Sequence, residues 1–306
     1  MESKVDHANE VVEHLASQGY VASQDIATTV FLGMKMQKPI LVEGPAGVGK
    51  TELAKALSKA LEVDLIHLQC YEGLDESKAI YEWEYAKQLL YTQMLKEKIH
   101  ELVSDSSNLK DSIEELSKQE DAFFSKHFLL PRPLLKSITL GRPNILLIDE
   151  IDKSDPEFEA YLLEVLSSFE ITIPELGKIE ATSIPLVFLT SNNSRDLSDA
   201  LKRRCLHLYV DFPSNDLEAQ IVASRFPDLD TELIASMVDA ISNIRTLDIK
   251  KKPSIAETLD WAKALISLQI GDINHESLTK TLGVICKYQS DIEQVHNQME
   301  EVLKDS

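Results

Sequence analysis

The stretch Gly44-Pro45-Ala46-Gly47-Val48-Gly49-Lys50-Thr51 decides the fold class of this chain. It fits the pattern G-x-x-x-x-G-K-[S/T], a match that would arise by chance in on the order of one chain in a hundred. An apolar strand is predicted over 39–43, directly before it, and a helix with one apolar face follows it. Glycines let backbone N–H groups close around phosphate oxygens, and the emerging helix points its positive end at the same anion. The stretch therefore predicts a phosphate-binding loop, in preference to an ordinary glycine-rich turn.

The polar residues of this loop have separate expected roles. Lys50 is expected to supply a mobile positive charge for the β- and γ-phosphates of a nucleotide, and the Thr51 hydroxyl is placed for Mg²⁺. The residues that we expect to bind the nucleotide here are Gly44, Pro45, Ala46, Gly47, Val48, Gly49, Lys50, Thr51 and Glu52.

Two adjacent carboxylates follow a second apolar strand, predicted over 144–148. Side chains alternate along a strand, so Asp149 and Glu150 can take different tasks. We expect Asp149 to hold Mg²⁺ through its water shell, because this ion prefers oxygen ligands. Glu150 is expected to orient and polarise the attacking water. Asp152 is interpreted as a solvent-facing residue of an acidic turn.

Strand and helix patterns alternate from about residue 37 to 212. Further strands are predicted over 64–68, 185–190 and 205–210. Most are continuous apolar runs, typical of strands that are covered on both faces. Beyond 213, helical periodicity dominates to the end of the sequence. The prediction is an α/β fold with a parallel sheet between helical layers over 1–212, followed by a smaller all-α lid domain over 213–306.

Three local features lie within the first of these domains. Residues 171–181 alternate on either side of a glycine-containing turn and predict a β-hairpin. Residues 87–126 are polar and charge-rich, which predicts one or two exposed helices or simply a solvated surface insertion. A helix is predicted to begin near Pro156, capped by Ser154 or Asp155.

Polar residues also stand next to two other predicted strands. Asn192 follows the strand at 185–190, where ligands gather in open α/β sheets, and its amide can hold water or the γ-phosphate. Taken alone, it would more often be a turn residue. The triplet Lys202-Arg203-Arg204 precedes the last strand. Such a triplet is usually a solvated helix end, but beside a phosphate-binding loop it can supply an arginine to a neighbouring subunit's nucleotide.

Charge disfavours two large classes of function. Thirty-one Lys and Arg residues against 51 Asp and Glu residues give a net charge of −20, the wrong sign for gripping nucleic acid or an anionic membrane surface. Hydrophobic residues make up 43% of the chain, too many for a disordered protein. No secretory signal and no apolar run of about 20 residues is visible, so we expect a cytoplasmic protein.

Cysteine and histidine usage predicts neither disulfides nor a metal centre. Cys70, Cys205 and Cys286 lie far apart, which is typical of reduced thiols. The histidines show no ligand spacing, and the H-x-x-C run from His67 to Cys70 is interpreted as core packing rather than a zinc site. The expected metal is nucleotide-bound Mg²⁺.

The order of these motifs resembles the AAA+ ATPases, and within them the MoxR branch. The motifs are GPAGVGKT (44–51), ILLIDE (145–150), the hairpin, LTSN (189–192) and LKRRC (201–205). A closer similarity is to the CoxD-like subgroup, associated with maturing the metal centre of carbon monoxide dehydrogenase. It rests on LQCYEGLDESKAIYEWEYAKQLLY (68–91), LLIDEIDKSDPEFEAYLLEVLSSFEITIPELG (146–177), SDALKRRCLHLYVDFP (198–213) and KKPSIAETLDWAKAL (251–265).

The resemblance implies residue roles that the spacing alone does not give. Asn192 would be the sensor-1 residue and Arg204 the arginine finger, with Arg203 as the alternative. Tyr20 and Val21 would line the adenine. In one respect the chain departs from the family, because no arginine stands at the sensor-2 position within 252–257. Lys251 and Lys252 are nearby cations, and we assign no sensor-2 residue.

The resemblance also implies partners and a mode of action. Such proteins form ring-shaped homo-oligomers, usually hexamers, with ATP at the subunit interfaces. They act as chaperone-like remodellers beside a partner with a von Willebrand factor A domain. The client would be a metalloenzyme such as a molybdenum hydroxylase. Two alternatives stay open: a DNA-directed AAA+ motor or clamp-loader-like ATPase, and a small-molecule P-loop kinase, which would not need Arg204 from a neighbour.

Overall fold

The computed structural model describes residues 5–94, 128–174 and 176–304. A five-stranded parallel sheet forms its centre, in the order β2-β5-β8-β1-β9. The strands are β1 (Ile40–Glu43), β2 (Asp64–Gln69), β5 (Asn144–Asp149), β8 (Leu186–Ser191) and β9 (Leu206–Tyr209). Each bound lies within one residue of the predicted one, and the predicted α/β fold class is confirmed. Because all five strands run parallel, their carboxyl ends share one edge, where ligands of such sheets bind.

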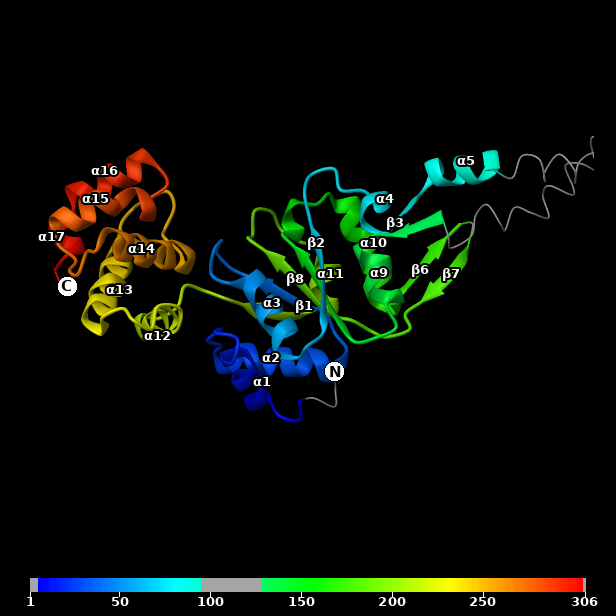
Figure 1. Cartoon of the computed structure of the whole chain (residues 1–306), viewed down its shortest axis with the longest axis horizontal. Coiled ribbons are helices and arrows are strands. Elements are labelled where there is room, and N and C mark those ends of the chain that lie inside the picture. Colours follow the sequence, from blue (N-terminus) through cyan, green and yellow to red (C-terminus); the bar gives the residue numbers. More distant parts are fainter. Residues whose placement is uncertain (1–4, 95–127, 175, 305–306) are drawn as a thin grey trace, which may run out of the picture.

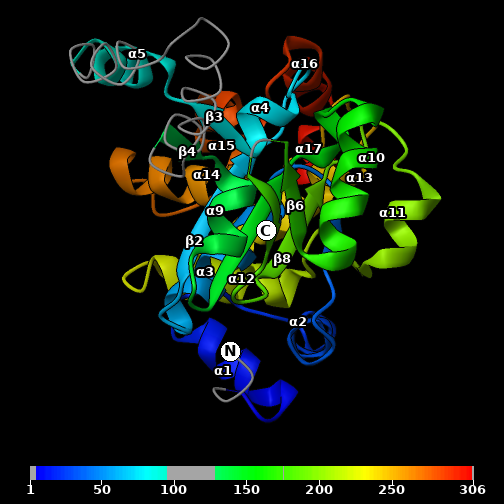
Figure 2. The same ribbon diagram turned by 90° about the vertical axis from the view of Figure 1, so that its right-hand side faces the viewer.

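Helices cover both faces of the sheet, and successive strand residues alternate between the two apolar cores. Ile40 and Val42 pack into one core and Leu41 into the other. The first core is covered by α1 (Ala8–Ala16), α2 (Gln24–Met36) and α3 (Lys50–Ala60). The second is covered by α9 (Pro133–Thr139), α10 (Pro156–Ser168) and α11 (Asp199–Arg204). Figures 1 and 2 show this layered arrangement.

Some elements were not predicted from the sequence. These are α1 and α2, the short helix α4 (Glu76–Ala79), and the antiparallel pair of β3 (Tyr81–Trp83) with β4 (Leu129–Pro131). Helix α5 (Tyr85–Met94) extends away from the sheet in Figure 1. The predicted insertion at 87–126 lies outside the described residues except for 87–94, which are helical and mostly exposed.

The predicted hairpin is present as β6 (Glu170–Ile173) paired with β7 (Gly177–Glu180). The start of α10 at Pro156 also agrees with the prediction, and Asp155 occupies the cap position. The predicted side-chain cap of this helix, however, is not formed. The Ser154 hydroxyl donates to the carbonyl of Ile151 at 2.8 Å in the short helix η3 (Ile151–Lys153). Asp155 instead accepts from the backbone N–H of Gly73 at 3.1 Å, so both side chains fix loops.

The segment after β9 folds into helices around an apolar core of its own. They are α12 (Asn215–Arg225), α13 (Thr231–Thr246), α14 (Ile255–Leu268), α15 (His275–Ile285), α16 (Gln289–Asn297) and α17 (Met299–Val302). Trp261 is fully buried at the centre of this core and donates from Nε1 to the Thr281 hydroxyl at 2.8 Å. We refer to α12–α17 as the lid, which lies at one end of the molecule in Figure 1. The division of the chain into domains at 212/213 stays a prediction.

The lid touches the sheet domain at the phosphate-binding loop. The backbone N–H of Ala256, in the first turn of α14, donates to the carbonyl of Gly47 at 3.3 Å. Within the described parts of the chain, no helix is long and apolar enough to cross a membrane.

Candidate nucleotide-binding site

Glycine is required at two points of the loop between β1 and α3. Gly44 has φ 149°, and a Cβ built there would lie 2.0 Å from the carbonyl oxygen of Val210. Gly47 has φ 80°, and its Cβ would lie 2.1 Å from the hydroxyl oxygen of Ser254. A side chain at either position would push apart the loop and the segments packed against it. The glycines of the motif are therefore fixed by the fold as well as by phosphate chemistry.

The loop presents a row of backbone donors. The N–H groups of residues 46–52 make no hydrogen bond of ordinary geometry to any acceptor in the described chain. They converge at the N-terminal end of α3, where the helix dipole favours negative charge. An anion with several acceptor oxygens fits such a cradle, and phosphate is the usual one.

Lys50 is buried and engages all three protons of its ammonium group. Its Nζ donates to the carbonyls of Gly44 and Pro45 at 2.7 and 2.6 Å, and to Oδ1 of Asn192 at 2.8 Å. Burial lowers the pKa of Lys50 to about 8, although three nearby carboxylates act in the opposite direction. Phosphate oxygens are the stronger acceptors for such a group, so an entering phosphate can replace these contacts.

Asp149 and Thr51 are brought together as the sequence predicted. The Thr51 hydroxyl lies 2.9 and 3.1 Å from the two carboxylate oxygens of Asp149. Thr190, at the end of β8, donates to Oδ1 of Asp149 at 2.5 Å. A hydroxyl and one carboxylate, completed by waters and substrate phosphates, are the oxygen ligands that suit Mg²⁺. No group of three or more His, Cys, Asp or Glu residues that could hold a metal ion occurs among the described residues.

The expectation for His67 was wrong. Its side chain is 39% exposed at the edge of the sheet, and its Nε2 lies 3.2 Å from Oδ2 of Asp149. Cys70 is buried, as expected. Residues alternate along β2, and Cys70 comes three residues after His67, so the two face opposite sides. The two side chains therefore neither pack together in the core nor face each other as zinc ligands would.

Glu150 stands at the sheet edge in a left-handed backbone conformation, with φ 56° and ψ 50°. Its carboxylate accepts hydrogen bonds from Gln69 at 2.9 Å, Lys153 at 2.6 Å and the Asn192 amide at 3.1 Å. Asn192 thus bridges Lys50 and Glu150, one through its oxygen and the other through its nitrogen. This unusual backbone conformation for a non-glycine residue is often found at functional sites.

Asp152 is buried rather than solvent-facing, which corrects the expectation from the sequence. It accepts from the backbone N–H groups of Asn192 and Ser194 at 3.2 and 3.0 Å, and from the Ser194 hydroxyl at 2.6 Å. Burial alone would raise the pKa of Asp152, but these hydrogen bonds outweigh it and hold the pKa below its usual value. Asp152 therefore fixes the turn that carries Asn192.

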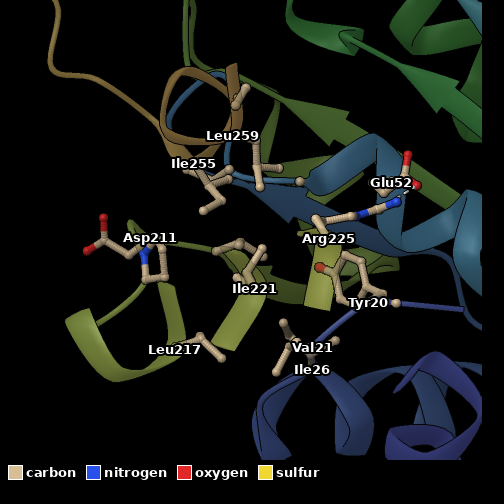
Figure 3. A pocket seen from close by; sticks show the side chains of 17 residues that line it. Tyr20, Val21, Ile26, Glu52, Asp211, Leu217, Ile221, Arg225, Ile255 and Leu259 are labelled. Carbon is tan, nitrogen blue, oxygen red and sulfur yellow. Dashed lines mark hydrogen bonds and ion pairs between the residues drawn. The ribbon is translucent and has the colours of Figure 1, made fainter. Parts of the chain in front are cut away.

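A pocket of about 440 Å³ continues from the loop between the sheet domain and the lid. Figure 3 shows the side chains that line it. Tyr20, Val21 and Glu52 are among them, together with Gly47, Val48 and Gly49 of the loop. Most of the remaining lining is aliphatic, from Ile26, Val210, Leu217, Ile221, Ile255 and Leu259. A flat apolar base fits this lining, and the volume lies in the usual range for small-ligand sites.

The Tyr20 hydroxyl stays protonated over the ordinary pH range. Burial, and secondarily the charge of Glu52, raise the pKa of Tyr20 well above its usual value. The residue can therefore offer a hydrogen-bond donor to a ligand without adding a charge.

Comparison with known proteins agrees with this geometry. The family model for the AAA domain, dynein-related subfamily, matches residues 39–205, more than half of the chain. The chain belongs to this AAA family. Membership makes it an AAA+ ATPase by family and a nucleotide-binding protein, and the predicted MoxR and CoxD-like assignments are finer than this match.

Similar proteins occur in staphylococci. An uncharacterized protein of Staphylococcus haemolyticus is 26% identical over 76% of this chain and 77% of its own length. Uncharacterized proteins of Staphylococcus saprophyticus and Staphylococcus aureus are 25% identical, over 77% and 79% of this chain and 78% and 82% of their own lengths. Their names add no activity, substrate or partner.

In this AAA domain, Arg203 and Arg204 form the exposed end of α11. Neither side chain makes a hydrogen bond or ion pair with any residue that the structure describes. The cluster of Lys50, Asp149, Glu150 and Asn192 is thus assembled within one subunit without either arginine.

The position expected for a sensor-2 arginine is occupied by packing residues. Ser254 abuts Gly47, and its backbone N–H donates to Glu257 at 2.9 Å. Lys251 pairs with Glu257 at 3.3 Å, and neither Lys251 nor Lys252 lines the pocket. Sequence reasoning missed a different lid cation, Arg225, which does line it. No local signal marks that residue, because its neighbours in the pocket come from distant parts of the chain.

Proposed function

We propose that this protein is a MoxR-type AAA+ ATPase that hydrolyses ATP to remodel or mature a client metalloenzyme. The observation that carries the ATPase part is the hydrogen-bonded line Lys50–Asn192–Glu150, beside the Thr51–Asp149 pair and at the end of an apolar pocket. Binding groups for phosphate, metal and water stand in one place. That is the set of parts that phosphoryl transfer to water requires.

In this proposal the loop N–H groups and Lys50 hold the phosphates of ATP. Thr51 and Asp149 would hold Mg²⁺, which neutralises charge on the phosphates when it is bound. Glu150 orients a water molecule, whose oxygen forms a bond to the γ-phosphorus as the bond to the β,γ-bridging oxygen breaks. The proton of the water passes to Glu150, and ADP and phosphate leave. Asn192 fixes the Glu150 carboxylate and offers its amide to the γ-phosphate.

Arg204 completes the site from a neighbouring subunit, with Arg203 as the alternative. Its exposed guanidinium, which has no hydrogen-bond or ion-pair partner among residues 5–94, 128–174 and 176–304, supports this role because it is available to a second copy of the chain. A homo-oligomeric ring, usually a hexamer in the family that the sequence resembles, would place it there. Hydrolysis would then depend on assembly.

Two finer parts of the proposal rest on the sequence resemblance to the CoxD-like subgroup: a metalloenzyme client such as a molybdenum hydroxylase, and a partner with a von Willebrand factor A domain. The proposed cytoplasmic location rests on the sequence prediction alone. The net charge of −20 supports a protein client over nucleic acid. No feature of the pocket specifically favours a metabolite kinase.

Trapping the client tests this function directly. Glu150→Gln protein with ATP and Mg²⁺ should bind nucleotide without turnover and retain the client metalloenzyme. Glu150→Gln combined with Lys50→Ala is the matched control, because it cannot hold ATP and should release the client. Retention that does not depend on ATP, or ATP-dependent retention of DNA alone, would contradict the proposal. Transfer of labelled γ-phosphate to a metabolite rather than to water would establish the kinase alternative.

A further inference from the structure

Arg225 is the last residue of α12 and the only lysine or arginine among the described residues that line the pocket. Its Nη2 lies 3.5 Å from Oε1 of Glu52, which belongs to the first turn of α3. Figure 3 shows the Arg225 side chain extending toward Glu52. This ion pair therefore joins the lid to the sheet domain at the pocket.

The position of Glu52 places Arg225 close to the phosphate cradle. Glu52 directly follows Lys50 and Thr51, and its own backbone N–H belongs to the row of donors at the start of α3. A guanidinium that reaches the Glu52 side chain is within about one side-chain length of groups bound to those donors. Its planar fork of N–H groups matches phosphate oxygens better than a lysine ammonium does.

The pair with Glu52 is weak enough to be exchanged. Both side chains are partly exposed, at 43% and 42%, and the contact is long. Exposed pairs of this kind contribute little to stability. A phosphate group carries more charge than one carboxylate and offers several acceptor oxygens, so it competes effectively for the guanidinium.

Among the described residues that line the pocket, no other residue of the lid carries a positive charge. The start of α14 approaches the loop through Ser254 and Ala256, which carry no charge. Lys251, on the same segment, is held by Glu257.

We propose that Arg225 leaves Glu52 and binds the polyphosphate of a nucleoside di- or triphosphate, so that this residue couples the lid to the nucleotide. The inference rests on the proposed function, because it assumes that the pocket binds ATP. Glu52 has the opposite effect: its carboxylate repels phosphate and competes for the same guanidinium. Removing the charge of Arg225 and removing that of Glu52 therefore change nucleotide affinity in opposite directions.

Calorimetric titration of ATP, ADP and adenosine into variants of the full chain tests this opposition. Arg225→Ala should weaken ATP and ADP binding about tenfold, as expected for losing a charge-assisted contact, and change adenosine binding less than about twofold. Glu52→Gln should tighten ATP binding about two- to threefold, because it removes an exposed competing charge. Arg142→Ala is the control: Arg142 also forms an exposed ion pair, with Asp64 at 2.7 Å, and does not line the pocket. It should leave all three affinities unchanged.

The outcomes separate this inference from the proposed function. Wild-type protein that binds neither ATP nor ADP overturns both. Wild-type binding with unchanged affinity in Arg225→Ala overturns only the role of Arg225. Equal weakening by Arg225→Ala and Glu52→Gln assigns the pair to domain packing and also overturns the inference. If Arg225→Ala does not fold, Glu52→Gln decides alone, since unchanged or weaker ATP binding in that variant contradicts the proposal.

Discussion

On the phosphate side of the candidate site, polar side chains at the ends of β5 and β8 bond to one another and to Lys50, at distances between 2.5 and 3.1 Å. On the base side, aliphatic side chains from α2, α12 and α14 face the pocket, and Arg225, the one cation among the described residues that line it, makes a contact of 3.5 Å with Glu52. The first side is held by one sheet, whereas the second is formed by separate elements of two parts of the molecule. Under the proposed function, we therefore expect the chemistry on the side held by the sheet and the coupling to the lid on the other side.

The largest effect is expected for a variant that tests whether the phosphate side is complete within one subunit. Arg204→Ala should lower ATP turnover by about 10³-fold or more, as expected for an arginine finger, and leave ATP affinity nearly unchanged. Steady-state phosphate release and calorimetry measure the two quantities. Mixing this variant with Glu150→Gln protein should restore part of the turnover, because each supplies what the other lacks.

Arg203→Ala is the matched control for that experiment, since it removes the neighbouring exposed arginine of α11. Loss of turnover in Arg203→Ala with normal Arg204→Ala would transfer the role to Arg203. Normal turnover in both variants would show that the phosphate side needs no neighbour.

Glu150→Gln should lower turnover by about 10²–10⁴-fold while keeping ATP affinity, because only the proton acceptor is lost. Phosphate release and a titration with ATP give the two values. Glu157→Gln, an exposed glutamate on α10, is the control and should behave like wild type. Full activity of Glu150→Gln would contradict the assignment of the proton acceptor to Glu150.

The pKa of Lys50 predicts a pH dependence that distinguishes the two sides. Burial lowers that pKa to about 8 in the free protein, and bound phosphates favour the charged lysine. ATP affinity should therefore be highest below pH 8 and fall about tenfold between pH 7.5 and 9, because the neutral amine present at high pH must take up a proton to bind phosphate. Adenosine, which contacts the base side, should bind equally at both pH values. A flat profile for ATP would contradict the assignment.

Asp152→Ala should reduce turnover about tenfold and lower the unfolding free energy by about 1–3 kcal/mol, because the N–H groups of Asn192 and Ser194 lose their buried acceptor. Phosphate release and chemical denaturation measure these changes. Ser194→Ala removes one of the three hydrogen bonds and should give a smaller loss of both. Equal turnover in wild type and Asp152→Ala would mean that the Asn192 turn is held by other contacts.

The smallest effect is expected on the base side. Ile221→Ala removes part of one aliphatic wall and should weaken ATP and adenosine binding about equally, by roughly three- to tenfold, from the lost apolar contact. The turnover number at saturating ATP should stay the same. A change in turnover without a change in affinity would contradict the assignment of binding to the base side and of catalysis to the phosphate side.

The sequence predicted those features of the fold and the site that depend on residues close to each other along the chain. The phosphate-binding loop, Asp149 and Glu150 each follow a strand within a few residues, so an apolar run followed by glycines or carboxylates locates them. The predicted strand bounds agree within one residue for the same reason.

Features that depend on distant partners were missed or misjudged. Asp152 was predicted to lie in a surface turn because its hydrogen-bond partners, 40 and 42 residues further along the chain, cannot be seen in the local sequence. His67 lies on β2, one of the two edge strands of the sheet, and strand order cannot be read from a local sequence pattern. Arg225 meets Glu52 across 173 residues, so only the packing of the lid reveals the pair.

The contact between Gly47 and the first turn of α14 has a mechanical consequence. Ser254 and Glu257 bond to each other at the start of that helix, so the turn is braced and cannot easily deform by itself. A shift of Gly47, whose carbonyl accepts from Ala256, is therefore passed to the helix as a whole. A displacement of Gly47 would thus move the whole helical body that surrounds Trp261.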